Sequence, residues 1–373
     1  MKSNSVKRIL FIGNYHENYN RNAIFIKGLK KHKIIVYECN VKSYNIIKNL
    51  KFIIKSYKKI ISLNFDLILM HSPTILQIIF AKFLSIIKNV PLIHDIFISK
   101  LQTFYYDRGL YERNKMPKLF YKIFYYLLDL FECTISDYLL LDTYTHVKFF
   151  HEKFNISLKK FRRVLVGAQD DIFHPLKEEV RMDEKFIVGF WGTFIPVHGI
   201  EYIIKSAKIL EKDEQIQFVL IGKGQTYKES KDLVRNLEIS NLTFIPKTFL
   251  YLNQLKVLGK WISGFDIGLG IFGLGDKVLQ VIPTKIYEGI AMKLPMITCD
   301  SPAIKELFKN YESIALCKRA NPESLAEVIL ELKKDAKLRE KIKEKAYIIF
   351  NEICSIEAIG KRLIEIFNNV LRS

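Results

Sequence analysis

The sequence predicts two doubly wound α/β domains, each a parallel sheet with helices on its faces. Short apolar runs alternate with longer helical patterns along the chain, which is typical of buried parallel strands joined by crossover helices. The chain has 373 residues, which is more than one hydrophobic core usually supports. A polar segment from Lys177 to Glu184, without apolar periodicity, interrupts the alternation. We therefore expect a domain boundary there.

The apolar runs place strands on both sides of this boundary. In a first domain, residues 1–168, we expect strands at Arg8–Ile12, Ile34–Tyr37, Asp66–Met70, Pro91–His94, Tyr138–Leu141 and Arg163–Val166. After a linker over residues 169–184, a second domain over residues 185–355 is expected to have strands at Phe186–Trp191, Gln217–Ile221, Leu242–Phe244, Asp266–Leu269 and Met296–Thr298. Ligands of such folds lie beyond the carboxyl ends of the strands. The loops that follow the strands are therefore the places to look for chemistry.

Composition narrows the classes of protein. No apolar run is long and clean enough to cross a bilayer, because the most apolar region, Leu67–Ile98, contains lysines, histidines and prolines. Residues Met1–Arg8 lead directly into a strand and show no signal-peptide core. We therefore expect a cytoplasmic protein, either soluble or peripheral on the inner face of the membrane. The five cysteines are scattered, so we interpret them as core residues and not as metal ligands.

The positive charge is concentrated in the first half of the chain. Residues 1–170 hold 28 Lys and Arg against 12 Asp and Glu, whereas the remaining residues hold 30 against 27. This excess implies an acidic partner: a membrane surface, a nucleic acid or a phosphorylated acceptor. Segment Lys42–Leu63 would form a helix with an apolar stripe flanked by lysines, and Lys115–Phe131 repeats this mixture with many aromatic residues. An anionic membrane surface and ordinary packed helices with solvated lysines both remain open as explanations.

The segment Ile282–Pro302 carries the strongest signal for a binding site. We interpret Pro283 and Thr284 as a helix start with Thr284 as the N-cap. Free backbone N–H groups and the positive end of the helix dipole suit a diphosphate, and Lys285 adds a formal charge. Glu288, expected in the first turn, can accept two hydrogen bonds from a vicinal diol such as a ribose. In the simpler alternative, Glu288 only favours the dipole and Lys285 is solvated.

Glycines mark the loops after the first two strands of the second domain. Gly192 permits a tight turn after a strand, and His198 stands at a helix start, close enough to meet a phosphate. Gly222 and Gly224 would keep the approach of a nucleotide free of side chains. The alternative is that these glycines only form tight turns between strand and helix.

Polar residues end several strands of the first domain. His94 and Asp95 end one strand, and either side chain could orient an acceptor hydroxyl during catalysis. His71 ends the preceding strand in the same way and is a lesser candidate. Gly13 and Asn14 end the first strand and could approach an acceptor or a diphosphate. Arg21, at the next helix start, could bind an anionic group, and a solvated helix cap is an equal alternative for it.

Segment Ile282–Pro302 resembles the Pro-x-Lys-x-x-Glu-x-x-Ala-x-x-x-Pro signature of retaining, GT-B-fold glycosyltransferases of family 4, also called group 1. The family's order of features is also matched by Phe190–Gly199, Leu220–Gln225, Leu242–Pro246 and Phe265–Leu269. The resemblance implies two Rossmann-like domains facing across a cleft, with the nucleotide-sugar donor in the C-terminal one and the acceptor in the N-terminal one. It also implies that helix 356–373 packs back on the N-terminal domain and that His94 faces the donor sugar.

The chain departs from the family pattern at three positions. Thr193 and His198 stand where the family usually has Arg and Lys, so Lys285 is expected to carry most of the positive charge. Gln280 replaces the first of two glutamates and can still hydrogen-bond a donor sugar. The glycine-rich loop Gly270–Asp276 could wrap this sugar through its backbone N–H groups.

The residues and the resemblance together predict a hexosyl- or N-acetylhexosaminyl-transferase, and the resemblance implies transfer with retention. The enzyme would move a sugar from a nucleoside diphosphate to a glycan or lipid-linked glycan, in the synthesis of cell-surface polysaccharide or glycoconjugate. No Asp-x-Asp occurs, so we expect no metal and no cofactor other than the nucleotide-sugar co-substrate. The alternatives are a nucleotide-sugar epimerase on the same fold and a non-catalytic relative that binds a membrane or nucleic acid. We expect no nucleic-acid partner, because no reading motif is recognisable.

Overall fold

A computed structural model describes residues 5–372, apart from 42, 44, 114, 116, 177–183 and 248–251. The chain forms two compact units. The first comprises Met1–Tyr105, Gly109–Leu165 and Ile356–Ser373, and the second comprises Tyr106–Arg108 and Val166–Ser355. The main boundary lies between Leu165 and Val166, three residues before residue 168, the expected end of the first domain. Most of the polar segment in the expected linker lies outside the described residues.

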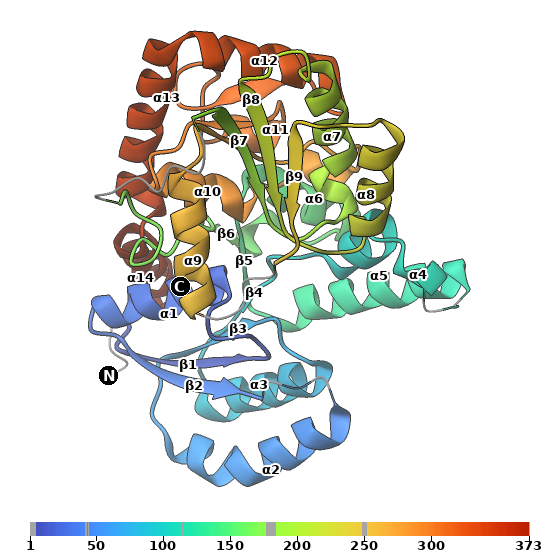
Figure 1. The fold of residues 1–373 in the computed structure, drawn as a ribbon. Helices are drawn as coiled ribbons and strands as arrows, with labels where there is room; N and C mark the ends of the chain where they lie inside the picture. Colours follow the sequence, from blue (N-terminus) through green and yellow to red (C-terminus); the bar gives the residue numbers. More distant parts are fainter. Residues whose placement is uncertain are drawn as a thin grey trace. The chain divides into compact units, whose positions relative to one another are not determined.

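The first unit contains a parallel sheet of six strands in the order β2-β1-β3-β4-β5-β6 (Figure 1). Every pairing in it is parallel. The strands are β1 (Arg8–Gly13), β2 (Ile35–Asn40), β3 (Leu67–His71), β4 (Leu92–Asp95), β5 (Tyr138–Leu141) and β6 (Phe161–Arg163). The last strand was expected at Arg163–Val166 but spans Phe161–Arg163, because these are the residues that pair with β5.

Helices cover both faces of this sheet, with α1 and α14 on one face and α2 and α3 on the other (Figure 1). They are α1 (Asn20–Lys31), α2 (Ile46–Ser62), α3 (Ile75–Lys88), α4 (Leu110–Arg113), α5 (Lys118–Ile135), α6 (Tyr144–Phe154) and α14 (Ile356–Arg372), with the π-helical segment η1 (Leu101–Asp107) and the 3-10 turn η2 (Leu158–Lys160). Local signals set their ends. Thr74 begins α3 with a capping box, and Asn89 ends it in the left-handed conformation.

The C-terminal helix α14 belongs to the first unit and crosses α1 at two glycines. A Cβ on Gly360 would lie 2.5 Å from the carbonyl oxygen of Gly28 and 2.8 Å from its Cα. A Cβ on Gly28 would lie 2.7 Å from the carbonyl oxygen of Ile356. The two backbones therefore meet directly, and this close crossing attaches the end of the chain to its beginning.

The second unit contains another parallel sheet of six strands, in the order β12-β11-β10-β7-β8-β9. Its strands are β7 (Phe186–Trp191), β8 (Ile216–Ile221), β9 (Leu242–Ile245), β10 (Ile267–Leu269), β11 (Met296–Cys299) and β12 (Ala315–Cys317). The sequence missed β12, whose three residues are too few to show a pattern. The fold class, two parallel α/β sheets, is confirmed.

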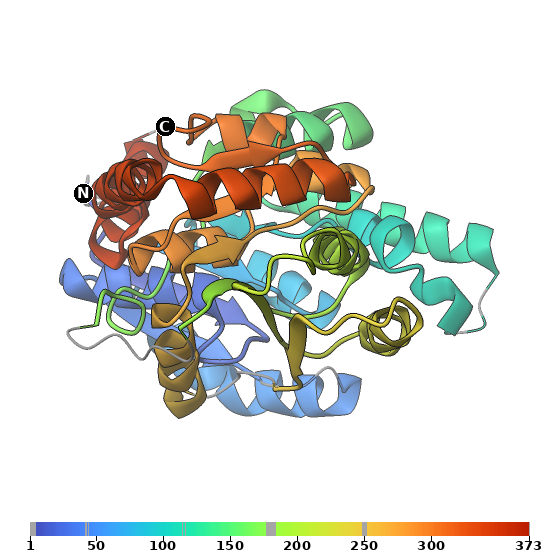
Figure 2. The same cartoon turned by 45° about the horizontal axis from the view of Figure 1, so that its top comes forward.

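The core of the second unit lies between this sheet and its helices. The helices are α7 (Ile200–Ile209), α8 (Tyr227–Asn236), α9 (Leu252–Ser263), α10 (Thr284–Ala291), α11 (Pro302–Lys305), α12 (Pro322–Lys334) and α13 (Ala336–Ile349), with short turns η3 (Pro196–His198), η4 (Asp276–Leu279) and the π-helical η5 (Phe350–Cys354). Helices α7 and α12 pack side by side, and Figure 2 shows α12 running across this unit. In the described part of the chain no helix is long and apolar enough to cross a membrane.

The crossing of α1 and α14 can be tested by adding one methyl group. Gly360→Ala should lower the free energy of unfolding by about 1–2 kcal/mol, because the methyl group separates two packed backbones and outweighs the gain in helix propensity. Gly259→Ala in α9 is the matched control, since its Cβ would find its nearest neighbour at 3.5 Å. The control should stabilise by about 0.5–1 kcal/mol. Urea unfolding of both variants measures the difference, and equal effects would contradict the close crossing.

Candidate functional site

The start of α10 meets the end of β7 in the second unit. A Cβ on Gly192 would lie 3.4 Å from Cε and Nζ of Lys285, so the amine rests against the bare backbone of that glycine. Its Nζ also lies 4.0 Å from the centroid of the Phe190 ring. One strand position further, Trp191 Nε1 donates a hydrogen bond of 2.7 Å to Oε2 of Glu288. The structure thus brings together Gly192, Lys285 and Glu288, which the sequence placed in one site.

Lys285 carries a buried amine that lacks a hydrogen-bond partner among the described residues. Its side chain is 5 % exposed, and no described residue hydrogen-bonds to its Nζ. Burial lowers the pKa of this amine well below its ordinary value, and the nearby Glu288 only partly opposes the shift. A buried ammonium that lacks a partner destabilises the protein. The position therefore favours a ligand that carries negative charge.

Glu288 is buried as well, but its carboxyl is partly satisfied. Burial raises its pKa to about 7, against the opposing effects of the Trp191 hydrogen bond and the charge of Lys285. Among the described residues, Trp191 donates to Oε2, and none donates a hydrogen bond to Oε1. The indole fixes the orientation of the carboxyl group and leaves Oε1 to accept from another donor.

Two details of α10 correct the sequence interpretation. Pro283, with extended dihedral angles, occupies the N-cap position, and Thr284 is the first helical residue without a capping side chain. Proline suits this position because its fixed φ and missing N–H make it a poor helix interior residue but a good entry residue. Glu288 consequently lies one turn inside the helix and not in its first turn. Thr284 stays a candidate by position only.

His198 completes the same region from the turn η3. Its Nδ1 hydrogen-bonds to the carbonyl oxygen of Thr193, so Nδ1 carries the proton and donates. Burial and the positive charge of Lys285 lower the pKa of His198 well below its ordinary value. The imidazole is therefore neutral, and its Nε2 is an acceptor unless an anion raises the pKa again. The side chain of Thr193 is exposed.

The structure gives Gly222 and Gly224 a different reason from the one inferred. A Cβ on Gly222, whose φ is +150°, would lie 1.9 Å from the carbonyl oxygen of Gly192. A Cβ on Gly224 would lie 2.3 Å from the carbonyl oxygen of Phe194. Both glycines are thus required for the loops after β7 and β8 to pack backbone against backbone. This packing holds Gly192 in place beside Lys285.

The glycine-rich loop Gly270–Asp276 does not offer a row of free amides. The N–H groups of Phe272 and Gly273 donate to the carbonyl oxygens of His198 and Val197, and that of Gly270 donates to Ile297. The expectation that this loop wraps a sugar through its backbone is therefore wrong for its first half. The loop instead supports the turn that carries His198. Gln280 follows η4 at the end of the loop and is half-buried.

In the first unit, Arg21 and Asp95 form a buried ion pair at the end of β4. Arg21 donates through Nε and Nη2 to both oxygens of Asp95, at 2.7 to 3.0 Å, and both side chains are fully buried. Its Nη1 donates to the carbonyl oxygens of Val164 and Leu165. The two sequence interpretations of Arg21, an anion-binding group and a solvated cap, are both wrong. The guanidinium is an internal anchor.

Asp95 also holds His71. Its Oδ2 lies 2.7 Å from Nδ1 of His71, which must donate because the carboxyl group is ionised. Burial alone would raise the pKa of Asp95, but the charge of Arg21 and the hydrogen bond of His71 hold it at about 2. Both carboxylate oxygens are therefore occupied, and Nε2 of His71 is buried without a hydrogen-bond partner in the described residues.

Three neighbouring strand ends carry such atoms without partners. Among the described residues, Nε2 of His71 at the end of β3, Nδ1 of His94 near the end of β4 and Nδ2 of Asn14 directly after β1 are buried and lack a hydrogen-bond partner. Burial lowers the pKa of His94 to about 3, so this imidazole is neutral. Gly13 ends β1 against the carbonyl oxygen of His71, 2.2 Å from where its Cβ would lie. The structure thus gathers the first-domain candidates along one edge of the sheet.

The sequence missed two partners. Trp191 could have been found as a polar indole at a strand end, next to the glycine of the loop. The second is the buried pair of Asp142 and His146 after β5, whose Oδ1 and Nδ1 lie 2.9 Å apart, while Nε2 lacks a partner in the described residues. Its signal was an Asp-x-x-x-His spacing at a helix start. In the described part of the chain, no group of three or more His, Cys, Asp and Glu could hold a metal ion.

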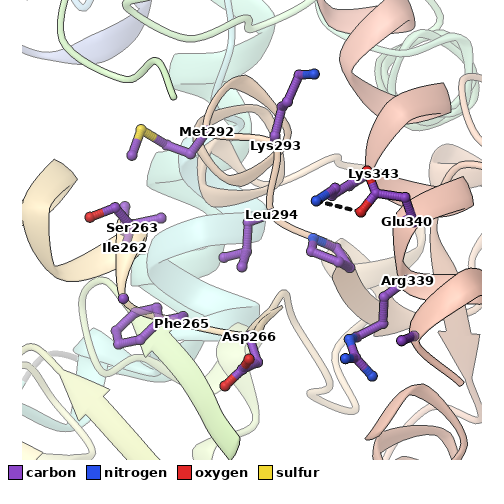
Figure 3. A pocket seen from close by; sticks show the side chains of 13 residues that line it. Ile262, Ser263, Phe265, Asp266, Met292, Lys293, Leu294, Arg339, Glu340 and Lys343 are labelled. Atoms are coloured by element: carbon purple, nitrogen blue, oxygen red, sulfur yellow. Dashed lines mark ion pairs between the residues drawn. The ribbon is translucent and has the colours of Figure 1, made fainter. Parts of the chain in front are cut away.

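The second unit contains a pocket of about 270 Å³. It is lined among others by Phe265, Asp266, Lys293, Arg339 and Lys343 (Figure 3). Phe265 and Asp266 precede β10, so the pocket lies at the amino end of that strand, away from the start of α10. Its charged side chains are occupied: Asp266 accepts from the N–H of Ile187, and Lys343 pairs with Glu340. The pocket is therefore distinct from the site described above.

The sequence of the second unit is similar to that of known proteins. Residues 174–348 match the family described as glycosyl transferases group 1. The chain is 25 % identical over 182 residues to an uncharacterised glycosyltransferase of Methanocaldococcus jannaschii, which covers 46 % of each chain. It is 23 % identical over 178 residues to the chitobiosyldiphosphodolichol beta-mannosyltransferase of Candida albicans, which covers 46 % of this chain and 38 % of that one. The matches thus span less than half the length of these curated relatives.

Solved structures extend the likeness in fold to the whole chain. The structure of Anabaena HepE in complex with UDP-glucose covers 97 % of this chain and 99 % of its own, with a TM-score of 0.72 and 13 % identity. Sucrose-phosphate synthase from Thermosynechococcus elongatus covers 98 % and 99 %, with a TM-score of 0.71 and 11 % identity. At these identities the likeness establishes the GT-B fold.

The buried ion pair in the first unit can be tested by removing one charge. Asp95→Asn should lower the free energy of unfolding by about 3–5 kcal/mol, because Arg21 is left as an uncompensated buried charge. Asp213→Asn is the matched control: its pair with Lys333 is one-third exposed and should cost about 1 kcal/mol or less.

Urea unfolding at pH 7 measures both variants. Because the pKa of Asp95 is lowered in the folded protein, its contribution is present above about pH 4 and is lost as the pH falls towards 2. The difference between wild type and Asp95→Asn should therefore shrink over that range. A difference that stays constant with pH would show that Asp95 is not held by charge.

Proposed function

We propose that this chain, a group 1 glycosyltransferase by its matched C-terminal region and its GT-B fold, transfers a sugar from a nucleoside diphosphate to an acceptor. The observation that carries the proposal is the unpartnered buried amine of Lys285 beside the bare backbone of Gly192. A diphosphate is an anion that would supply the missing partner. The proposal is supported by the sequence match of residues 174–348.

The start of α10 suits the diphosphate of such a donor. The first N–H groups of a helix lack partners within it, and their dipoles favour an anion at this end. Lys285 adds a positive charge in a setting poor in water, where its attraction for an anion is strong. We propose that this charge and the helix start stabilise the departing diphosphate, and that no metal is needed for this step.

Glu288 would bind the ribose of the donor. A carboxylate can accept hydrogen bonds from both hydroxyls of a vicinal diol, and the Trp191 indole holds the group in one orientation. HepE binds UDP and UDP-glucose in the structures that resemble this chain, which supports a nucleotide-sugar donor here. We propose a donor of the hexosyl or N-acetylhexosaminyl type, with Gln280 near the sugar and transfer with retention of the anomeric configuration.

The acceptor would bind at the strand ends of the first unit. We propose that Nε2 of His71 accepts the proton of the acceptor hydroxyl in a hydrogen bond, with Asp95 fixing the tautomer through Nδ1. This ranking differs from the sequence interpretation, in which His94 or Asp95 took that place. His94 remains a proposed neighbour of the sugar, whereas Asp95 becomes a positioning residue because both its oxygens are occupied.

For the acceptor we propose a glycan or lipid-linked glycan, used in the synthesis of cell-surface polysaccharide or glycoconjugate. The Candida relative is named for a diphosphodolichol-linked substrate, which supports a lipid-linked acceptor. The basic first unit supports an anionic acceptor surface, reached from the inner face of the membrane. Nothing in this proposal requires a cofactor other than the donor itself.

Removing the amine of Lys285 tests the donor site. Lys285→Met should weaken binding of nucleoside-diphosphate sugars at least about 100-fold, because the diphosphate loses its cation. The same change should raise the free energy of unfolding by about 1–2 kcal/mol, since an unpartnered buried amine is replaced by an apolar side chain. Calorimetric titration with a panel of such sugars, together with urea unfolding, measures both effects.

The control for this test is Lys228→Met, which makes the same replacement at an exposed lysine of α8. It should leave both quantities unchanged. The proposal fails if wild type binds no sugar nucleotide of the panel, or if Lys285→Met binds as tightly as wild type. Net epimerisation of a bound sugar nucleotide, without transfer to any acceptor, would also overturn it in favour of an isomerase.

The raised pKa of Glu288 predicts how binding depends on pH. Only the carboxylate accepts both ribose hydroxyls, so affinity for a nucleoside-diphosphate sugar should rise about tenfold between pH 6 and pH 8, with a midpoint near 7. A diphosphate that is esterified at both ends does not titrate in this range, which leaves the change to the protein. Glu288→Gln should bind more weakly and lack this rise. A rise that persists in Glu288→Gln would assign it to another group.

A further inference from the structure

Three helices of the first unit expose an unusual number of large apolar side chains. Fourteen such residues on α2, α3 and α5 are 44 to 71 % exposed. They are Ile46, Ile47, Leu50, Ile54, Ile75, Ile79, Phe83, Ile86, Ile87, Leu119, Phe120, Ile123, Phe124 and Leu127. Scattered exposed apolar residues are normal, but a concentration of this size marks an interaction surface.

The three helices form one layer on the same face of the sheet. Residues of α2 and α3 are buried in a common core, and Phe131 and Ile135 of α5 pack against it. The rings of Tyr57 on α2 and Phe83 on α3 lie 6.3 Å apart. Figure 1 shows α2 and α3 together on this face. We call the outward side of these helices the apolar–basic face.

The charge of the apolar–basic face has one sign. Helix α2 carries five lysines, and α3 and α5 carry two each. The three helices contain only two carboxylates, Asp129 and Glu132, and both are buried. On α2 the exposed lysines, among them Lys48, Lys51 and Lys55, border the stripe of exposed isoleucines. The surface is thus apolar in part, cationic in part, and without an exposed acid of its own.

We infer that the apolar–basic face docks the first unit onto an anionic lipid bilayer. A bilayer surface offers what this face lacks: anionic headgroups for the lysines and, directly below them, hydrocarbon for the isoleucine and phenylalanine side chains. Long lysine stems reach the headgroups while the apolar stripe sinks beneath them. No described helix crosses a membrane, and this mode of attachment requires none.

The combination of the two features selects the bilayer over other partners. A nucleic acid would be met by lysines and by stacked or groove-reading side chains, and would leave fourteen exposed apolar groups in water. A second copy of the chain would bring the same lysines face to face, because a twofold interface pairs a patch with itself. Like charges on both sides would oppose that contact. An anionic bilayer is complementary to both the charge and the apolar surface.

This inference deepens the proposed function by naming the surface that would bring the enzyme to a lipid-linked acceptor, but the docking itself does not depend on sugar transfer. The two can therefore fail separately. Vesicle binding tests the face, and titration with nucleoside-diphosphate sugars tests the donor site in the same protein. All variants described below should keep the wild-type affinity for the donor.

The test is co-flotation of the full chain with vesicles of phosphatidylcholine alone or with 30 % phosphatidylglycerol. At 0.1 M NaCl, wild type should bind the anionic vesicles at least about tenfold better than the neutral ones. At 1 M NaCl, where the Debye length is about 3 Å, binding should fall but a residual part should persist through the apolar contacts. Absence of binding to anionic vesicles at 0.1 M NaCl would overturn the inference.

Two variants separate the two parts of the face. Lys48→Glu with Lys51→Glu and Lys55→Glu should lose at least about 100-fold in affinity, since each lysine near an anionic surface strengthens binding about fivefold. Ile54→Ser with Phe83→Ser and Phe124→Ser, one change on each helix, should abolish the binding that persists at 1 M NaCl. Thermal unfolding followed by circular dichroism shows whether each variant is folded.

Matched controls place the same changes on exposed residues of the second unit. They are Lys228→Glu with Lys231→Glu and Lys337→Glu for charge, and Ile209→Ser with Val257→Ser and Ile348→Ser for apolar surface. Both controls should float with anionic vesicles as wild type does. Equal losses in variants and controls would contradict docking through this face. A wild-type dimer in sedimentation velocity that the face variants convert to monomer, without vesicle binding, would assign the face to self-association.

Discussion

A buried amine without a hydrogen-bond partner among the described residues imposes the main constraint on the second unit. Lys285 lies against the Phe190 ring and the backbone of Gly192, and no described residue hydrogen-bonds to its Nζ. Keeping such a group buried requires a rigid surround. The loops after β7 and β8 supply it by packing backbone on backbone at Gly222 and Gly224, and Trp191 holds Glu288 beside the amine. The strain of an unsatisfied charge is thus located where a charged ligand would relieve it.

In the first unit, by contrast, the buried charges of Arg21 and Asp95 are paired. Both side chains are fully buried, and Nη1 of the guanidinium donates to the backbone carbonyl oxygens of Val164 and Leu165. The pair therefore presents no charge to a ligand. What reaches the edge of the sheet is His71, oriented by Asp95. An imidazole held in one orientation suits the recognition of a hydroxyl, whereas an amine without a hydrogen-bond partner suits a diphosphate, so the two units differ in the chemistry they can bind.

The outer surface of the first unit completes this division. Its sheet is covered on one face by α1 and α14, whose glycines allow close contact, and on the other by a layer whose outward side remains apolar and basic. Ordinary solvent-facing helices would carry mixed charges and few large apolar side chains. Among the described helices, the exposed large apolar side chains are concentrated on α2, α3 and α5. Donor chemistry, acceptor chemistry and membrane attachment would thus be assigned to separate surfaces of one chain.

Much of this was determined by local sequence. The alternation of strands and helices, the glycine-rich loops and the order Pro283, Lys285, Glu288 along the chain depend on neighbours in sequence. The fold class followed from these local patterns, and the proposal of a donor site starts from them. Only the tertiary structure decided which polar groups find partners. Arg21 and Asp95 are 74 residues apart, and Trp191 and Glu288 are 97 apart.

The carboxylate that pairs with Arg21 comes from a strand end far away in the sequence. No periodicity or spacing could therefore show that Arg21 is an internal anchor. The same holds for Lys285, whose amine is left without a partner. A sequence lists which charges a protein contains. Packing determines which of them are neutralised within the fold and which remain for a ligand.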